Sequence, residues 1–370
     1  MSKTLQSIAE AGTSIWLDDL SRERMIASGK ARHLASLIES DHVVGVTTNP
    51  AIFSASISQS SLYKDDLLRL ARDGHSAESI ITELTTADVA QACDMFMSVF
   101  EKSAGMDGRV SIEVDPRLAR DTQGTIEQAR ALWAKVNRPN VLIKVPATIE
   151  GLPAIKSLIA DGISVNVTII FSVQRYKDVL ESFIAGLEDR KSRGLSLSEI
   201  HSVASFFVSR VDTEIDPRLK SHQDSAASSL LGKAALANAR LAYEHFESMK
   251  TSPRWMKLES AGGNIQRPLW ASTGVKDPAY DPTMYVVDLV APLTVNTMPE
   301  PTLNAVRDAG TFKGNTISGA YDEARATLRK LHELGIDILH VAEKLEHEGI
   351  EKFIKPWLEL INAVDAAAHQ

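Results

Sequence analysis

The sequence predicts an α/β protein, a (β/α)₈ barrel with additional helices after the second strand and at the C-terminus. Two observations carry this prediction. Eight short runs rich in β-branched residues recur along the chain, and segments with helical periodicity separate most of them. The alternative is a doubly wound open sheet, which ordinarily has a glycine-rich phosphate turn after an early strand. The sequence contains no such turn, so the barrel is favoured.

The expected strands are the runs in which apolar and β-branched side chains cluster between turn signals. They cover residues 14–19, 43–50, 110–115, 141–148, 164–171, 202–210, 268–273 and 293–297. Asn49-Pro50 is a turn signal at the end of the second run. Helical spacing predicts helices over 125–136, 152–159, 176–187 and 230–249.

Two further segments hold more chain than a barrel needs. Residues 51–107 are too many for one crossover helix and are predicted to form several helices, as are residues from about 300 to 370. We expect one barrel domain over residues 1–370 that includes both segments. The apolar positions of these helices fit either a cap over the barrel or an oligomer interface, and the protein is expected to be a monomer or a homodimer.

The composition excludes several classes of protein. The 370 residues are 44% hydrophobic and 24% charged, and 40 basic against 48 acidic residues give a formal charge of −8. Neither sign forms a long run, so no nucleic-acid or membrane partner is expected. The single cysteine, Cys93, fits a reducing compartment. With no signal-peptide pattern and no apolar run of membrane-spanning length, we expect a cytoplasmic protein.

Lys144 is the one charged residue in the apolar run 141–148. Burial disfavours the ammonium form of a lysine, and only the neutral amine attacks a carbonyl to form a Schiff base. The other interpretation of this run is a lysine at a strand end whose stem lies along the protein and whose ammonium reaches solvent.

Polar side chains share one face in several of the expected strands. These sets are Thr47 with Asn49, Ser111 with Glu113 and Asp115, and Asn166 with Thr168. Because the outer face of a barrel strand packs against helices, we expect these sets to point inward, near the strand ends where barrel active sites lie. In the sixth run Ser205 and Arg210 fall on opposite faces, and we expect a bend at the end of that strand.

Five segments carry a family resemblance: 45–53, 110–115, 142–148, 166–172 and 205–210. In order and spacing they resemble the transaldolase family, and residues 16–22 and 269–276 resemble its longer bacterial branch. The resemblance implies a Schiff-base enzyme of the non-oxidative pentose phosphate pathway that needs no cofactor. It would move a dihydroxyacetone unit from sedoheptulose 7-phosphate or fructose 6-phosphate to an aldose phosphate, either glyceraldehyde 3-phosphate or erythrose 4-phosphate.

The resemblance also implies roles for individual residues. Lys144 matches the Schiff-base lysine of the family, and Asp18 matches its general acid/base, with Asp19 as the adjacent alternative. Glu113 and Thr168 match the pair that positions a catalytic water.

Other positions match the substrate contacts of the family. Asn49 and Asn166 match amides that hold substrate hydroxyls, with Thr47 and Ser272 beside them. Ser205 and Arg210 match the phosphate site. Shorter members of the family carry an arginine after the seventh strand, where Lys276 is the nearest cation in this sequence.

Three other functions remain as alternatives. A metal-dependent aldolase is disfavoured because the ten histidines, His33, His42, His75 and His201 among them, show no metal-ligand spacing. A fructose 6-phosphate aldolase would resemble this chain but carries tyrosine at the position of Phe207 and glutamine at that of Glu113. A binding barrel without activity would have no reason to gather an acid, a lysine and amides at its strand ends.

Overall fold

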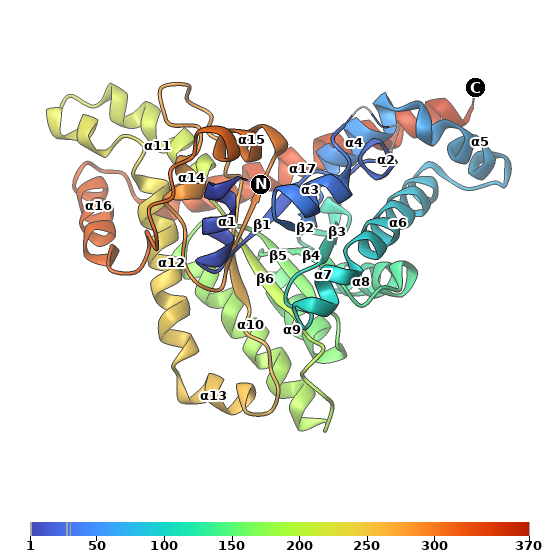
Figure 1. The fold of residues 1–370 in the computed structure, drawn as a ribbon, viewed down its shortest axis with the longest axis horizontal. Helices are drawn as coiled ribbons and strands as arrows, with labels where there is room; N and C mark the ends of the chain where they lie inside the picture. Colours follow the sequence, from blue (N-terminus) through green and yellow to red (C-terminus); the bar gives the residue numbers. More distant parts are fainter. Residues whose placement is uncertain (1, 27–28, 30, 370) are drawn as a thin grey trace.

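The computed structural model describes residues 2–26, 29 and 31–369, and its centre is a closed barrel of eight parallel strands (Figure 1). Each strand pairs with the next along the chain, and the last pairs with the first. The strands are β1 (Thr13–Asp18), β2 (Val43–Thr47), β3 (Arg109–Glu113), β4 (Val141–Pro146), β5 (Val165–Ile170), β6 (Ser202–Phe207), β7 (Arg267–Ala271) and β8 (Thr294–Met298). The predicted (β/α)₈ fold is confirmed.

Every expected strand is found, although most are shorter than expected at the C-terminal end. The second and the sixth differ most, each ending three residues early, and the sixth was predicted to reach residue 210. That prediction was wrong at its end, because β6 stops at Phe207 and helix α11 (Ser209–Ser221) begins two residues later. Arg210 therefore lies in the first turn of a helix. Strand alternation does not apply to it, which removes the conflict with the face of Ser205.

Helices surround the barrel on its outside (Figure 1). Those of the outer layer and its connections are α1 (Lys3–Glu10), α2 (Arg22–Met25), α3 (Leu34–Ser40), η2 (Pro116–Leu118), α8 (Thr122–Val136), α9 (Gly151–Asp161), α10 (Val173–Ser192), η3 (Ser225–Leu230), α12 (Ala234–Lys250), α13 (Pro253–Glu259), α14 (Met284–Val287), α15 (Glu300–Ala309) and α16 (Tyr321–Glu333). The long segment after β2 forms α4 (Pro50–Gln59), η1 (Ser61–Tyr63), α5 (Lys64–Arg72), α6 (Ala77–Met95) and α7 (Met97–Lys102), as predicted.

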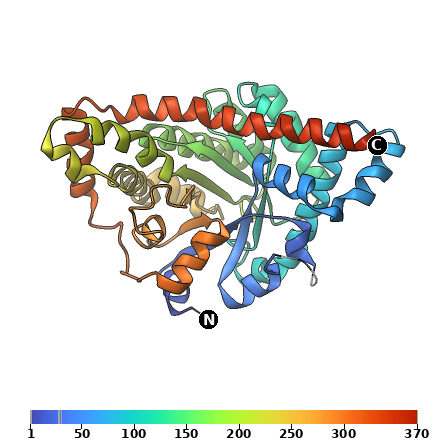
Figure 2. The same cartoon turned by 90° about the horizontal axis from the view of Figure 1, so that it is seen from above.

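The last helix, α17 (Ile338–Ala368), is 31 residues long and runs across the end of the barrel at which the strands finish (Figure 2). It packs against α4, α5 and α6 on one side of the barrel and against α11 and β5 on the other. The two segments beyond the minimal barrel, far apart in sequence, therefore pack on each other. No helix in the described part of the chain is long and apolar enough to cross a membrane.

Trp16 and Gly45 show how the interior near the strand starts is filled. The indole of Trp16 is fully buried and donates from Nε1 to Asp107 at 3.2 Å. A Cβ atom at Gly45 would lie 2.5 Å from the Trp16 ring, which is closer than packed atoms approach. Only glycine therefore lets β2 pass the indole. The polar groups expected on the inward face can then occupy the level above it.

Candidate active site

A cavity of about 200 Å³ opens at the C-terminal ends of the strands, beneath α17. It is lined by Asp18, Thr47, Asn49, Lys144, Thr168, Ser205, Phe207, Arg210, Ala271, Ser272, Gly274, Lys276, Thr297, Pro299 and Phe353. Nine of the eleven site residues proposed from the sequence are in this set. Glu113 and Asn166 are the two exceptions, and both touch residues of the lining.

Lys144 lies in the interior of the barrel and is 4% exposed. Its Nζ donates to the backbone carbonyl of Thr48 at 3.0 Å and lies 3.5 Å from Oε2 of Glu113. The ring of Phe353, from α17, lies over the ammonium with 5.5 Å between Nζ and the ring centroid. The solvent-reaching alternative for this lysine is therefore wrong, because the side chain stays buried beside a carboxylate and under an aromatic ring.

Glu113 shares this burial, with 5% of its side chain exposed. Burial raises the pKa of Glu113 to about 7, and the nearby Lys144 opposes that rise only in part. A carboxyl group with a pKa near neutrality can both give and take a proton at physiological pH, which is the requirement for general acid/base catalysis.

Asp18 ends β1 and accepts a hydrogen bond of 2.6 Å from the hydroxyl of Thr47. Thr47 Oγ1 also lies 2.7 Å from Oγ1 of Thr297 on β8. Because Thr47 has one hydroxyl proton and gives it to Asp18, Thr297 is the donor in the second bond. Burial raises the pKa of Asp18 and the charge of Lys144 lowers it, with the rise larger. The adjacent Asp19 points elsewhere and accepts from Nε of Arg24 at 2.7 Å.

Two buried oxygens at the centre of the site have no hydrogen-bond partner among the described residues: Oε1 of Glu113 and Oγ1 of Thr168. Buried polar atoms are normally paired, so unpaired ones mark places where a ligand or water can bind. Thr168 is followed by Ile169 in a left-handed conformation, with φ of 57°, and the pairing of β5 with β6 shifts there. A β-bulge of this kind re-aims neighbouring side chains.

The two asparagines expected to hold substrate hydroxyls differ in position. Asn49 lines the cavity and caps α4, accepting from the Ile52 amide at 3.1 Å, so its Nδ2 is the group left for a ligand. Asn166 is fully buried below the cavity. It donates to Ser111 at 3.0 Å and accepts from the Ser205 hydroxyl at 2.7 Å. Asn166 thus reaches the cavity through Ser205.

Two cations line the cavity, Arg210 in the first turn of α11 and Lys276 after β7. Nη1 of Arg210 is buried and makes no hydrogen bond within the described part of the chain, while the Phe207 ring lies 5.4 Å from its guanidinium carbon. Burial lowers the pKa of Arg210, with Glu348 opposing the change. Ser272, with φ of 55°, lines the same cavity, and its hydroxyl is 3.0 Å from that of Ser209. Helix N-termini with an arginine bind phosphate well.

The sequence did not identify three parts of the site. Thr297 contacts Thr47, the residue that donates to Asp18. The backbone carbonyl of Thr48 accepts a hydrogen bond from Lys144. Strand alternation in β8 could have pointed to Thr297, which shares a face with Val295. Phe353 was noted as an apolar helix position, and nothing local in the sequence indicates that α17 folds back over β4.

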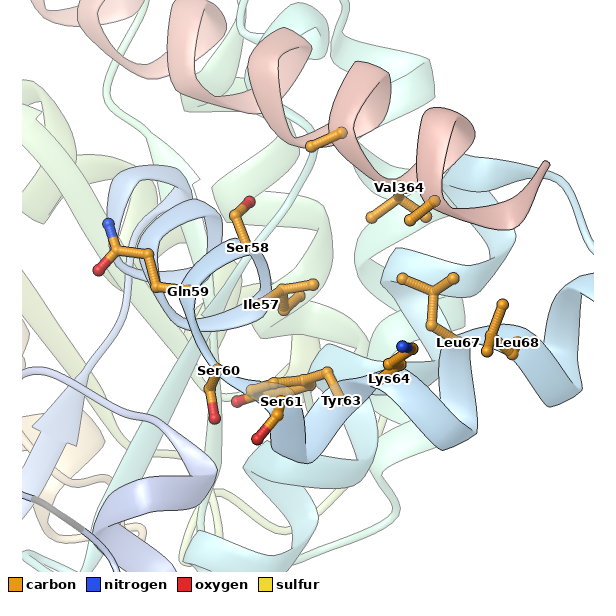
Figure 3. A pocket seen from close by; sticks show the side chains of 12 residues that line it. Ile57, Ser58, Gln59, Ser60, Ser61, Tyr63, Lys64, Leu67, Leu68 and Val364 are labelled. Atoms are coloured by element: carbon orange, nitrogen blue, oxygen red, sulfur yellow. The ribbon is translucent and has the colours of Figure 1, made fainter. Parts of the chain in front are cut away.

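A second cavity, of about 630 Å³, lies between α4, η1, α5 and the end of α17 (Figure 3). Its labelled side chains are mostly apolar or hydroxyl-bearing, and Lys64 is the one charged residue among those that line it. It therefore offers no acid/base pair. Among the described residues, no three histidine, cysteine, aspartate or glutamate side chains gather as a metal site would require.

Comparison with known proteins identifies the family of the chain. Residues 15–364 match the model of the family described as Transaldolase/Fructose-6-phosphate aldolase. The chain is 55% identical over 367 residues to a transaldolase of Renibacterium salmoninarum, with 99% of this chain and 97% of that protein covered. It is 52% identical over 371 residues to one of Thermobifida fusca, with all of both chains covered. It is 54% identical over 359 residues to one of Mycolicibacterium smegmatis, covering 97% and 96%.

The family model covers nearly the whole chain, and these relatives exceed half identity along their full length. By its sequence and its barrel, this chain belongs to the transaldolase/fructose-6-phosphate aldolase family.

Proposed function

We propose that this protein is a transaldolase of the non-oxidative pentose phosphate pathway. It transfers a dihydroxyacetone unit from sedoheptulose 7-phosphate or fructose 6-phosphate to glyceraldehyde 3-phosphate or erythrose 4-phosphate, through a Schiff base on Lys144. The observation that carries the proposal is the placement of Lys144 beside Glu113, at a cavity that Asp18 and two cations also line. The relatives named transaldolase support the same conclusion.

The first step is imine formation at C2 of the ketose. The neutral amine of Lys144 attacks the carbonyl carbon, and the carbinolamine then loses water to give an iminium. The unpaired oxygens of Glu113 and Thr168 are suited to hold one water between them, through which Glu113 supplies the proton that the departing hydroxyl needs. The same water would attack the iminium when the product is released.

The second step breaks the bond between C3 and C4. Asp18 takes the proton of the C4 hydroxyl, C4 leaves as an aldehyde, and the electron pair of the bond moves into the iminium to form an enamine. Thr47 holds the Asp18 carboxylate in place for this step. When the acceptor aldehyde binds, the enamine attacks its carbonyl carbon, and Asp18 returns the proton to the new hydroxyl.

The substrate phosphate lies at the Arg210 and Lys276 end of the cavity in this proposal. Arg210 offers a rigid fork and an unpaired nitrogen, and Lys276 is a mobile point charge. In the same proposal, C2 of the ketose binds at Lys144 and its hydroxyls near the Nδ2 of Asn49. Asn166 holds Ser205 in position and acts on the substrate through that serine.

A fructose 6-phosphate aldolase is the second candidate, since the family model includes both activities. Glu113 and Phe207 favour transfer, because the aldolase branch carries glutamine and tyrosine at these positions. Phe207 is 6% exposed and packs on Phe171 with ring centroids 5.2 Å apart, so it adds no hydroxyl to the cavity. An assay of glyceraldehyde 3-phosphate release from fructose 6-phosphate separates the two: transfer requires erythrose 4-phosphate, and simple cleavage does not.

The remaining expectations stay predictions. They are a cytoplasmic location, a monomer or homodimer, and a single domain that includes residues 51–107 and 300–370. Light scattering of the purified chain tests the oligomeric state.

Borohydride trapping tests the central proposal. The protein is incubated with fructose 6-phosphate and sodium borohydride, digested, and the modified peptide is located by mass spectrometry. The expected result is a substrate-dependent adduct on Lys144 that is missing from a folded Lys144→Met variant. An adduct on another lysine, or none, overturns the assignment of the nucleophile.

A further inference from the structure

A third cavity lies at the opposite end of the barrel, where the strands begin. It measures about 330 Å³ and is lined by Arg109, His201, Asn264 and Arg267, with Lys250 and Glu259 at its exposed edge. Helices α12 and α13 lead to this end, which is the one remote from α17 (Figure 1). Along β3 the distance from Arg109 to Glu113 is about 13 Å, at about 3.3 Å per residue, so this cavity is separate from the candidate active site.

Arg109 begins β3 and is 1% exposed. Its Nε donates to the Gly105 carbonyl at 2.8 Å and its Nη1 to the Pro139 carbonyl at 3.1 Å. Its Nη2 is buried and has no hydrogen-bond partner in the described part of the chain. The other contact of the guanidinium is the Phe100 ring, 4.9 Å from its central carbon. No carboxylate of the described residues forms an ion pair with Arg109.

The neighbouring charges leave the positive charge of Arg109 uncompensated. Asp107 is the carboxylate whose charge acts on Arg109, but it pairs with Arg267 at 2.9 Å and also accepts from Ser14 at 2.8 Å. The partly buried Asp107 is thus engaged by Arg267 and not by Arg109. Burial, and secondarily the charge of Arg267, lowers the pKa of Arg109 to about 9, which leaves the guanidinium charged at neutral pH.

His201 faces the same space as the free nitrogen of Arg109. A Cβ atom built at Gly105 would lie 3.0 Å from Nε2 of His201 and 3.3 Å from Nη2 of Arg109, so both atoms border that point. Nε2 of His201 is 3.3 Å from Nδ2 of Asn264, which makes the ring nitrogen the acceptor. Burial, followed by the charges of Arg109 and Arg267, lowers the pKa of His201 to about 3. The imidazole is therefore neutral and adds no opposing charge.

We propose that this cavity at the start of the strands binds a small phosphate-class anion, with Nη2 of Arg109 as its central donor. A buried guanidinium without a counter-charge is costly, and one bound oxyanion would supply both the missing charge and the missing acceptor. Arginine presents donors in a geometry that fits phosphate oxygens. The cavity has room for inorganic phosphate and for a small phosphate monoester. The site is independent of the activity proposed above.

The test separates this cavity from the phosphate end of the active site. An Arg210→Gln, Lys276→Ala background removes the active-site cations, and inorganic phosphate is titrated into it by calorimetry. In parallel, the imidazole nitrogens of His201 are followed by NMR. The expected result is saturable binding in this background, with a shift of the His201 signals that follows the same isotherm. Glycerol 3-phosphate is titrated in the same way, and whichever probe binds more tightly identifies free phosphate or a monoester as the preferred form.

Variants of the cavity complete the test. Adding Arg109→Gln is expected to weaken binding by at least about tenfold, the loss of one charge-assisted hydrogen bond. Arg109 also donates to two backbone carbonyls, so this variant can fail to fold. Two substitutions at the exposed edge of the cavity therefore serve as a matched pair that leaves Arg109 in place. Lys250→Glu is expected to weaken binding and Glu259→Lys to strengthen it, each by about threefold at low salt. Absence of a His201 shift at about 10 mM phosphate, or equal affinity in the two edge variants, overturns the proposal.

Discussion

The ring of Phe353 lies over the ammonium of Lys144, 5.5 Å from Nζ to the ring centroid. The two residues come from α17 and β4, so the last helix of the chain covers the residue proposed as its nucleophile. An aromatic ring in this position attracts the ammonium and excludes water from the space above it. The C-terminal helix is therefore part of the candidate active site. The role of the Phe353 ring above Lys144 can be tested directly.

Replacing Phe353 with alanine is expected to reduce both stability and transfer. Loss of this buried ring lowers the free energy of unfolding by about 3–5 kcal/mol, because a cavity remains. Without the ring, water reaches the enamine intermediate, so more dihydroxyacetone is released for each transfer. Urea unfolding and product ratios with and without erythrose 4-phosphate measure the two effects.

Leu358 offers the control, since it lies on the same helix and is 42% exposed. Leu358→Ala is expected to change stability by less than about 0.5 kcal/mol and to leave the product ratio unchanged. A Phe353→Ala enzyme with the product ratio of the wild type would contradict the proposed role of the Phe353 ring.

Asp18 and Asp19 are adjacent in sequence, but the structure gives them different surroundings. Asp18→Asn is expected to lower kcat by about 10²–10⁴-fold, the usual contribution of a general acid/base. Borohydride trapping on Lys144 is expected to persist in this variant, because imine formation precedes the step assigned to Asp18.

Asp19→Asn is the matched variant and weakens the contact with Arg24 instead. Its expected effect is a loss of stability of about 1 kcal/mol or less, with kcat within a few-fold of wild type. If Asp19→Asn gives the larger loss of kcat, the assignment of the two carboxylates is reversed.

The raised pKa of Glu113 gives the folded protein a defined pH dependence. The folded state holds this proton up to about pH 7, whereas an ordinary glutamate releases it at about 4.5. The folded state therefore binds more protons in that window, and stability falls as pH rises from about 4.5 through 7. Below pH 4.5 the glutamate is protonated in both the folded and the unfolded state, so Glu113 causes no loss of stability there.

Glu113→Gln has no proton to release, so it removes this contribution. The difference in free energy of unfolding, variant minus wild type, is expected to grow as pH rises from 5 to 8. Urea titrations across that range measure it. A difference that stays constant with pH would show that Glu113 titrates at its ordinary value.

Much of the barrel and its site could be predicted because the signals are local. Alternation within β3 and β5 placed Glu113 and Thr168 on the inward face, the apolar run 141–148 singled out Lys144, and β-branched runs marked all eight strands. Arg210 was misplaced on a strand for a physical reason. The run 202–208 continues past the end of β6, Val208 still donates to the Ala271 carbonyl of β7 at 2.9 Å, and helix α11 begins without a side-chain cap.

Other features depend on contacts between distant segments and leave no local signal. Asn166 has the alternation of a cavity residue but lies below the cavity, where Ser205 and Ser111 engage both ends of its amide. The unpaired charge of Arg109 is likewise invisible in the sequence. The environment of Arg109 depends on the ion pair between Asp107 and Arg267. Arg267 lies on β7, whereas Arg109 lies on β3.

Arg210 and Lys276 are expected to recognise the substrate phosphate with different strengths. Arg210 is partly buried with an unpaired nitrogen, and Arg210→Gln is expected to raise the KM for fructose 6-phosphate by about 10–100-fold. Lys276 is exposed, so Lys276→Ala is expected to raise it by about threefold, an effect that shrinks at high salt.

Unphosphorylated fructose separates phosphate binding from chemistry. If both cations act on the phosphate, kcat/KM for fructose changes little in either variant while that for fructose 6-phosphate falls. Lys220→Ala is the control, because Lys220 is a nearby exposed lysine that pairs with Asp277, 2.8 Å away, and does not line the cavity. Equal losses with fructose and fructose 6-phosphate would mean that Arg210 supports the structure of the site and not the phosphate.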